Sequence, residues 1–390
     1  MTLLYTLAMG LSIGAGAMVS RRVGEKDIEG AARTAAQVLA FGLLVAVVIG
    51  AAGAFFAPRL LVLMGASPGA LANAAFTRVM LGASASVLLL FLANAVFRAT
   101  GDAAFAMRSL WLANGINIVL CPALVFGWGP LPELGIVGAA VGTSVGRGVG
   151  ALWAVLRLMR PGARLQIRLS HFKLEGAFVA RIVRLSGSAT FQVFIGMASW
   201  VGLVRIMAGF GSAALAGYTI GMRIVLFALM PSFGLSNAAA TMVGQALGAK
   251  KPERAEAAVW RAGLYNLVFL GVVGLAFVVF ARPVVAMFTA DAAVAAHAVS
   301  ALRIVSSGFV FYAYGMVLTQ SFNGAGDTRT PTWINLFCFW LLELPLAWLL
   351  SGPLGLGPNG VFIALLTAFS SLAVVSVLLF RRGTWKTTTL

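Results

Sequence analysis

Charged residues are scarce in this chain. Of its 390 residues, 10% are Asp, Glu, Lys or Arg, whereas 61% are hydrophobic. The mean hydropathy is +0.97. A water-soluble fold of this length needs far more polar surface than this composition supplies. The scarcity of charge therefore excludes a soluble globular protein and predicts a membrane protein.

Residues that commonly carry chemistry are also few. The two cysteines, Cys121 and Cys338, both fall in apolar stretches and are too few for a disulfide framework. His171 and His297 are far apart and are expected in loops, so they predict no metal site. No Gly-Lys-Ser or Gly-Lys-Thr phosphate loop is present, which argues against ATP-driven transport. We therefore expect no cofactor and, without a cluster at catalytic spacing, no enzyme.

The apolar stretches are about as long as membrane-spanning helices, which need roughly 20 apolar residues. None shows the strict alternation of a barrel strand. The prediction is an all-α integral membrane protein with 11 transmembrane helices. They are expected at about 2–19, 34–57, 76–97, 107–128, 136–157, 183–207, 214–243, 258–281, 299–321, 332–351 and 360–380.

The net charge of +17 arises from basic residues in short loops between the apolar stretches. Because they form no patch or helical stripe, they indicate membrane topology and not a nucleic-acid partner. Arg21 and Arg22 follow the first span, and alternating sides from there places most basic residues in the cytoplasm. We expect a multi-pass protein of the inner (plasma) membrane, with the N-terminus of this chain outside and its C-terminus cytoplasmic.

The sequence contains an internal repeat. Gly10-Leu11-Ser12 recurs as Gly234-Leu235-Ser236, and Gly101-Asp102 recurs at nearly the same shift as Gly326-Asp327. The interval contains six spans, an even number, so equivalent segments enter the membrane in the same direction. The two halves are therefore parallel repeats, an arrangement in which transporters bind substrate between the halves.

The repeat predicts four parts. They are an N-terminal bundle at 1–158, a basic cytoplasmic linker at 159–182, a C-terminal bundle at 183–380 and a cytoplasmic tail at 381–390. The first bundle has five spans where the second has six (5 + 6). The counterpart of the span at 183–207 would precede Met1, so we expect either translation from an upstream start or a truncated product. The linker could contact anionic lipid headgroups, although a solvated, topology-fixing linker is the simpler interpretation.

The repeated blocks resemble the conserved segments of the multidrug and toxic compound extrusion (MATE) exporters. In the first half these are the segments Gly10 to Gly24, Arg98 to Asp102, Asn117 to Pro122 and Gly135 to Ala140; in the second they are Gly234 to Gly248, Phe322 to Thr328 and Leu344 to Ala347. Within them, Gly24, Gly101, Asp102, Gly248, Gly326 and Asp327 form the loop motifs. The resemblance covers essentially the whole chain, in the family's order and spacing.

The resemblance implies twelve helices in two six-helix lobes, of which this chain supplies the second to the twelfth. It implies a secondary antiporter that exports amphiphilic, often cationic, organic compounds in exchange for H+ or Na+ by alternating access. We expect such small molecules and membrane lipids as partners, and a monomer. Two alternatives stay open: a flippase for lipid precursors from the same superfamily, and a truncated chain without transport activity.

Glu343 is the main coupling candidate, because it alone among the eleven acidic residues falls in the middle of an expected span. A charge at the bilayer centre is costly, so an intramembrane carboxylate indicates function by default. Pro345 frees a backbone carbonyl nearby and is a hinge candidate, as is Pro231. The alternative is a structural carboxylate bonded to a neighbouring helix.

The family's known coupling patterns are not intact. The proton-coupled branch carries an aspartate four residues after an asparagine; here Asn117 is present but Cys121 stands in the aspartate's place, and a thiol is a poor substitute. Gly196 and Tyr312 stand where the sodium-coupled branch has carboxylates. The remaining polar residues expected within spans either bond substrate or link helices: Asn94, Thr143, Gln192 and Gln320. Asp102 and Asp327 are expected to cap local turns.

Overall fold

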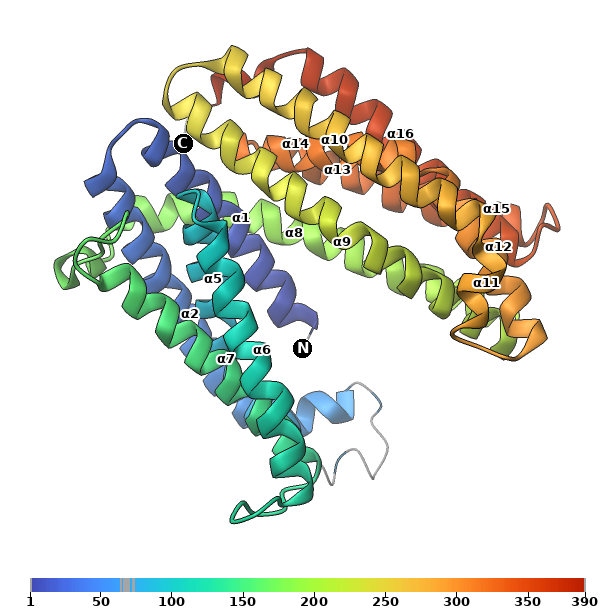
Figure 1. Cartoon of the computed structure of the whole chain (residues 1–390), viewed down its shortest axis with the longest axis horizontal. Helices are drawn as coiled ribbons and strands as arrows, with labels where there is room; N and C mark the ends of the chain where they lie inside the picture. Colours follow the sequence, from blue (N-terminus) through green and yellow to red (C-terminus); the bar gives the residue numbers. More distant parts are fainter. Residues whose placement is uncertain (1, 64, 66–70, 72–73, 389–390) are drawn as a thin grey trace. The chain divides into compact units, whose positions relative to one another are not determined.

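The computed structural model describes residues 2–63, 65, 71 and 74–388. Within these ranges the ordered elements are all helical (Figure 1). In the described part of the chain, nine helices are long and apolar enough to cross a membrane, and two bent helix pairs bring the number of candidate spans to as many as 11. The all-α membrane architecture predicted from hydropathy is therefore confirmed.

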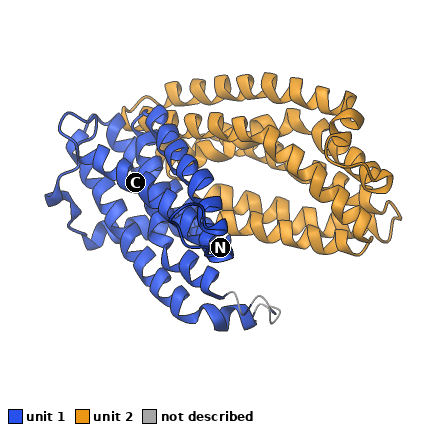
Figure 2. Ribbon diagram, turned by 60° about the horizontal axis from the view of Figure 1, so that its bottom comes forward, with its two compact units in different colours: residues 1–190 blue, residues 191–390 orange. Residues whose placement is uncertain are grey.

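The chain divides into two compact units, Met1–Thr190 and Phe191–Leu390 (Figure 2). Unit 1 contains α1 (Thr2–Gly24), α2 (Ile28–Leu63), α4 (Ala74–Gly82), α5 (Ser84–Ala99), α6 (Ala103–Phe126), α7 (Ile136–Met159) and the short 3-10 helix η1 (Leu169–Phe172). The helix α8 (Gly176–Ala208) begins in unit 1 and continues into unit 2.

The remaining elements of unit 2 follow α8 along the chain. They are α9 (Ser212–Gly248), α10 (Pro252–Val279), α11 (Ala281–Ala286), α12 (Ala292–Ser307), α13 (Phe309–Ala325), α14 (Arg329–Asn335), the π-helical segment η2 (Leu336–Glu343), α15 (Leu344–Ser351), α16 (Pro358–Arg381) and η3 (Thr384–Thr387).

The internal repeat is visible in the backbone. Lys26 and Lys250, which correspond under the repeat, are the two described residues other than glycine with positive φ, at 61° and 57°. The same pair of backbone hydrogen bonds closes both turns, from Lys26 to Val23 and Asp27 to Arg22 in one, and from Lys250 to Leu247 and Lys251 to Ala246 in the other. This is the pattern of a left-handed helix C-cap. Gly24 and Gly248 each end the helix before the turn.

A second pair of turns repeats at nearly the same interval. Gly101 and Gly326 have φ of 86° and 87°, a conformation that strongly favours glycine. After each glycine an aspartate oxygen accepts a backbone N–H: Asp102 from Phe105 at 3.1 Å, and Asp327 from Thr330 at 3.1 Å. Both aspartates therefore act locally, as caps of the turns that they follow.

Both units also contain a bent span at an equivalent position. Helices α4 and α5 meet at a 40° bend, and α12 and α13 meet at a 60° bend. The residues at the two breaks, Ala83 and Gly308, correspond under the same repeat as Gly101 and Gly326. The predicted single spans at 76–97 and 299–321 are thus broken helices, a feature that hydropathy does not report.

Helix α8 begins at Gly176, before the expected start at 183. Its early turns pack against the glycine face of α1: a Cβ added at Gly10 would collide with Thr190, and one added at Gly14 would collide with the hydroxyl of Ser186. Small residues at this spacing let helix backbones approach closely. The two compact units meet at Thr190, inside α8.

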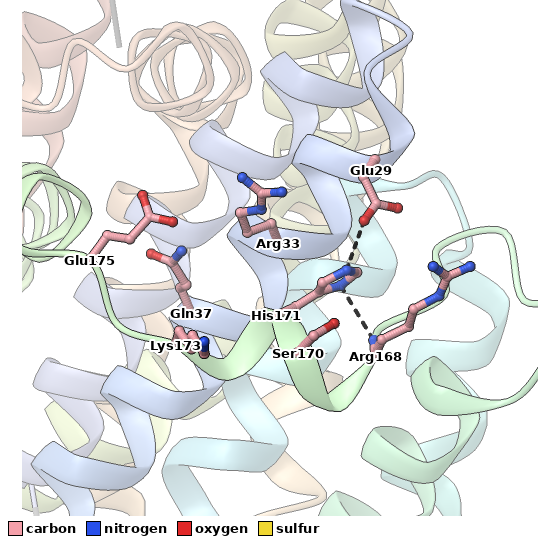
Figure 3. Close-up of a pocket in the computed structure, with 8 residues that line it drawn as sticks. All are labelled: Glu29, Arg33, Gln37, Arg168, Ser170, His171, Lys173 and Glu175. Carbon is pink, nitrogen blue, oxygen red and sulfur yellow. Dashed lines mark hydrogen bonds and ion pairs between the residues drawn. The ribbon is translucent and has the colours of Figure 1, made fainter.

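The linker between α7 and α8 is attached to unit 1 by a buried histidine. His171, only 5% exposed, lies in η1, and its Nε2 is 2.8 Å from a carboxylate oxygen of Glu29 in α2 (Figure 3). Its Nδ1 accepts the backbone N–H of Arg168 at 3.3 Å. The expectation of two loop histidines is also wrong for His297, which lies within α12.

Candidate functional site

Glu343 is the last residue of the π-helical segment η2 and is 2% exposed. Ser199 of α8 donates a hydrogen bond to its Oε2. The same serine Oγ lies 3.3 Å from the backbone oxygen of Phe339, one turn before Glu343. The Ser199 hydroxyl therefore bonds one oxygen of the buried Glu343 carboxylate and has a second acceptor, the Phe339 carbonyl, within reach.

Two further hydrogen bonds attach this part of the chain to α8. The indole Nε1 of Trp340 donates to the backbone oxygen of Ile195 at 3.1 Å, and Nδ2 of Asn335 donates to the backbone oxygen of Gln192 at 3.4 Å. Residues 192, 195 and 199 share one face of α8 at helical spacing. Side chains in and next to η2 thus donate hydrogen bonds to backbone oxygens along that face of α8. π-Helical turns of this kind recur at functional sites.

Two unpaired polar groups lie in the core of unit 2 against which Leu344, the residue after Glu343, packs. Within the described residues, the hydroxyls of Tyr218 and Tyr312 are buried and have no hydrogen-bond partner. An unpaired buried hydroxyl is unusual in proteins. These two groups leave hydrogen-bonding capacity unused in that core.

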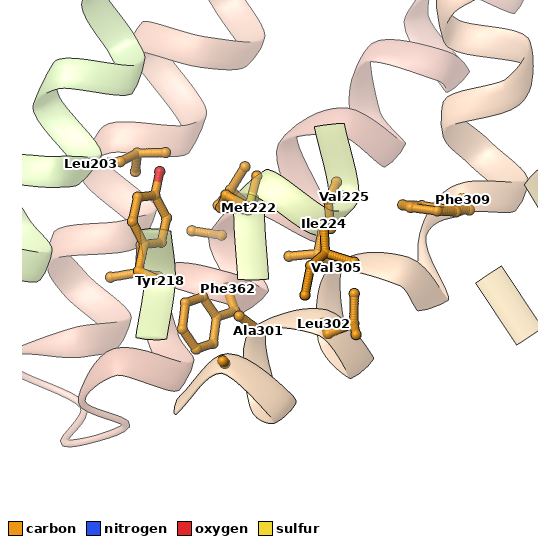
Figure 4. Packing of buried hydrophobic residues seen from close by; sticks show 14 of the residues in the cluster. Leu203, Tyr218, Met222, Ile224, Val225, Ala301, Leu302, Val305, Phe309 and Phe362 are labelled. Carbon is orange, nitrogen blue, oxygen red and sulfur yellow. The ribbon is translucent and has the colours of Figure 1, made fainter. Parts of the chain in front are cut away.

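Both tyrosines pack against aromatic rings in the core of unit 2. Tyr218 of α9 lies between Leu203 of α8 and Phe362 of α16 (Figure 4). Its ring stacks on Phe362 with centroids 6.4 Å apart and an interplanar angle of 2°. Tyr312 contacts Phe369 at a centroid distance of 4.7 Å. Aromatic packing therefore fixes both tyrosines, although neither hydroxyl is bonded.

Unit 1 brings together another set of predicted residues. Asn117 of α6 donates through Nδ2 to Oγ1 of Thr143 in α7 at 2.9 Å. Cys121 lies one turn after Asn117, and its backbone faces Gly142, where an added Cβ would lie 2.9 Å from the Cys121 Cα. All three predicted residues are partly buried at one contact between helices. The hydrogen bond links α6 to α7, as the helix-linking interpretation requires.

A row of glycines makes this close contact possible. Gly138, Gly142, Gly146 and Gly150 recur every four residues along α7 and face α6. A Cβ at Gly146 would lie 2.5 Å from the backbone oxygen of Ala113. This row is not among the residues predicted from the sequence, although the repeated Gly-x-x-x-Gly spacing is a known signal of helix contact.

The remaining predicted residues have different hydrogen-bond partners or none. Asn94 in α5 accepts a hydrogen bond from Ser109 in α6 at 2.6 Å and is 2% exposed. Gln192 is 6% exposed, and its side-chain oxygen has no partner among the described residues. Gln320 in α13 accepts from Asn323 at 2.8 Å. Unit 1 thus holds Asn94, and unit 2 holds the two glutamines.

The two hinge candidates differ in their surroundings. Pro231 lies inside α9, which runs without a break from Ser212 to Gly248. Pro345 is in the first turn of α15, directly after η2. Because a proline has no N–H to donate, it leaves a carbonyl of the preceding turns without its helical partner. The change from π-helical to α-helical geometry coincides with Pro345 and Glu343.

The geometry defines a class of protein: two repeated helical bundles in a membrane, with a buried carboxylate in one of them, as in secondary transporters. The sequence model of the MatE family matches residues 1–123 and 188–349. The chain belongs to this family, whose members are secondary transporters and not enzymes, and the family resemblance of the repeated motifs is confirmed.

Relatives and solved structures agree. The probable multidrug resistance protein YoeA of Bacillus subtilis (strain 168) is 25% identical over 392 residues, 98% of this chain and 84% of the relative. The probable multidrug resistance protein NorM of Caulobacter vibrioides is 28% identical over 400 residues, 98% of this chain and 81% of the relative.

Two solved structures extend the comparison. An outward-facing multidrug resistance MATE family transporter of the MOP superfamily matches with a TM-score of 0.92 and 26% identity, over 99% of this chain and 86% of that chain. A MOP superfamily transporter from Pyrococcus furiosus matches with a TM-score of 0.91 and 25% identity over 99% and 86%. The latter is described as having a binding pocket of reversed polarity that suggests a different function.

Proposed function

We propose that this chain exports amphiphilic organic compounds, cations among them, in exchange for protons, and that Glu343 carries the proton. The names of the relatives as multidrug resistance proteins support the export of such compounds. The observation that carries the coupling role is the contact of the buried Glu343 with Ser199. A carboxylate in a low-dielectric interior is kept there for function more often than for stability.

The contact suggests how one proton could be taken up and released. When Glu343 is ionised, Ser199 donates its hydroxyl proton to Oε2. When Glu343 is protonated, its carboxyl donates to the Ser199 oxygen, and the serine proton turns to the Phe339 carbonyl 3.3 Å away. Each form then has a hydrogen-bonded partner, so neither leaves a buried polar group unpaired.

Exchange for Na+ is the alternative, and a specific feature favours it. The unpaired hydroxyls of Tyr218 and Tyr312 lie in the core against which Leu344, the residue after Glu343, packs, and could add oxygen ligands to a cation bound there. Carboxylate and hydroxyl oxygens suit a hard cation. The two couplings predict different driving gradients.

The test uses proteoliposomes that contain the purified chain and report ethidium transport by fluorescence. A pH gradient without Na+ should drive ethidium accumulation, and Glu343→Gln should abolish it, whereas Glu253→Gln, at the start of α10, should not. Transport driven only by a Na+ gradient would show that Na+, and not the proton, is the coupling ion. Transport under a pH gradient that survives in Glu343→Gln would reject Glu343 as the carrier.

We also propose that the chain lies in the inner membrane with its N-terminus outside and its C-terminus in the cytoplasm. The bias of basic residues supports this orientation. A fluorescent protein that folds only in the cytoplasm, fused after Leu390, should be bright. A dark fusion with normal expression of the full chain would reverse the orientation.

A further inference from the structure

A charged cavity lies beside the linker of unit 1. It has a volume of about 280 Å³ and lies between α2 and η1 (Figure 3). Helix α2 contributes Glu29, Arg33 and Gln37, which are spaced four residues apart and so share one face of the helix. Arg168 and Lys173 come from the linker on either side of η1.

The ion pair of His171 with Glu29 fixes the shape of the cavity. Because this 2.8 Å contact and the bond from the Arg168 backbone hold both ring nitrogens of His171, η1 stays against α2. Glu29 is thereby already engaged by His171. The ion pair thus holds η1, and with it the linker residues that line the cavity, next to α2.

The charges left in the cavity favour an anion. Among the described residues, Arg33, Arg168 and Lys173 have no ion-pair partner, and Glu175 is the one other acid that lines the cavity. Cationic side chains that surround a cavity together attract phosphate or carboxylate groups, and arginine suits phosphate in particular.

Gln37 adds a second, independent indication of a ligand. It is 2% exposed, lines the cavity, and its side-chain oxygen has no hydrogen-bond partner among the described residues. A buried amide left unpaired costs free energy that a bound polar group would recover. The ligand should therefore carry a hydrogen-bond donor as well as an anionic group.

Exposed apolar residues next in the sequence to the lining residues, here called the apolar rim, indicate that the ligand comes from the membrane. Leu169 and Leu174 of the linker are 79% and 41% exposed, and Ile28 at the start of α2 is 48% exposed. Apolar side chains beside cationic ones at the end of a membrane span match the boundary between headgroups and acyl chains. Soluble phosphate would make no use of this apolar rim.

We propose that this cavity binds the phosphate headgroup of a membrane lipid, with Arg33 and Arg168 on the phosphate and Gln37 on a hydroxyl or ammonium group of the headgroup. The lipid would hold the linker against α2, next to the first turns of α8. This role is separate from proton exchange at Glu343 and goes beyond it.

The test measures lipid binding to the purified full chain by native mass spectrometry. The probes are dioleoyl phosphatidylglycerol, dioleoylglycerol, which has the same acyl chains without the phosphate, and inorganic phosphate as a competitor. The Arg33→Gln, Arg168→Gln double variant should bind phosphatidylglycerol at least about tenfold more weakly than the wild type, as expected for the loss of two cations near a phosphate.

The matched control is the Arg160→Gln, Arg181→Gln double variant, which removes the same charge from exposed residues outside the cavity. It should bind like the wild type, and Gln37→Leu should bind more weakly than the wild type with no change in charge. Equal weakening in the control would assign the binding to general charge attraction. Equal binding of dioleoylglycerol, or displacement of the lipid by inorganic phosphate, would overturn the headgroup assignment.

Discussion

Ser199 in α8 and Glu343 at the end of η2 are hydrogen-bonded although they lie far apart in the sequence. The bond joins the helix that crosses from unit 1 into unit 2 to the one π-helical segment in the described part of the chain. Since Trp340 and Asn335 also bond α8, protonation of Glu343 would act on a contact that already links two spans. This is the kind of local change that can bias a helix rearrangement.

Replacing Ser199 should reduce turnover without removing substrate binding. Ser199→Ala leaves Glu343 without its hydroxyl partner, and hydrogen bonds to charged groups contribute about 1.5–3 kcal/mol, so ethidium turnover should fall about tenfold or more. Ser199→Thr keeps a hydroxyl and should restore most of it. Turnover and KM for ethidium in proteoliposomes are the measurements. A rise in KM with unchanged turnover would place Ser199 in substrate binding instead.

Hydropathy and the repeat predicted the membrane-spanning helices and the duplication, because lipid exposure and gene duplication both leave marks along the sequence. Glu343 was also predicted as a buried candidate from its position in mid-span. The π-helical segment was not, since it depends on hydrogen bonds to residues of α8 that are distant in the sequence. The bends at Ala83 and Gly308 lie within stretches that remain apolar, so hydropathy alone does not show them.

A single histidine in a basic segment gives no sign of burial, so the sequence predicts a loop position for His171. Its burial follows from the pairing with Glu29, a contact between distant parts of the sequence. The glycine row of α7, in contrast, was visible in the sequence. It was missed because glycines are frequent throughout the chain, which contains 45, and only the structure shows which of them face another helix.

The glycine row should be sensitive to a single added methyl group. Gly146→Ala places a Cβ 2.5 Å from the Ala113 backbone oxygen, so α6 and α7 must separate, and stability should fall by about 1–3 kcal/mol. Gly148→Ala lies on the same helix with its nearest contact at 3.9 Å and should be neutral or slightly stabilising. Melting temperatures in detergent compare the two. Equal melting temperatures would show that α6 and α7 do not require the glycine contact.

The Asn117 to Thr143 hydrogen bond can be separated from substrate binding by a double-mutant cycle. If it links helices, Asn117→Ala and Thr143→Ala should be coupled in stability by about 0.6 kcal/mol, and by no more than about 1.7 kcal/mol, with little change in KM for ethidium. Additive stability effects with a large rise in KM for either variant would instead place the pair in the substrate path.

The left-handed backbone conformation of Lys26 and Lys250 predicts a stabilising substitution at each of the two repeated turns. Lys26 and Lys250 adopt φ of 61° and 57°, where a Cβ is strained and glycine is not. Lys26→Gly and Lys250→Gly should therefore each raise stability by about 0.5–1 kcal/mol. Lys251→Gly, at the next residue with φ of −122°, has no such strain to relieve and should lower it. Thermal unfolding of the three variants gives the signs, and a loss of stability in both Lys26→Gly and Lys250→Gly would mean that these lysines make contacts that outweigh their backbone strain.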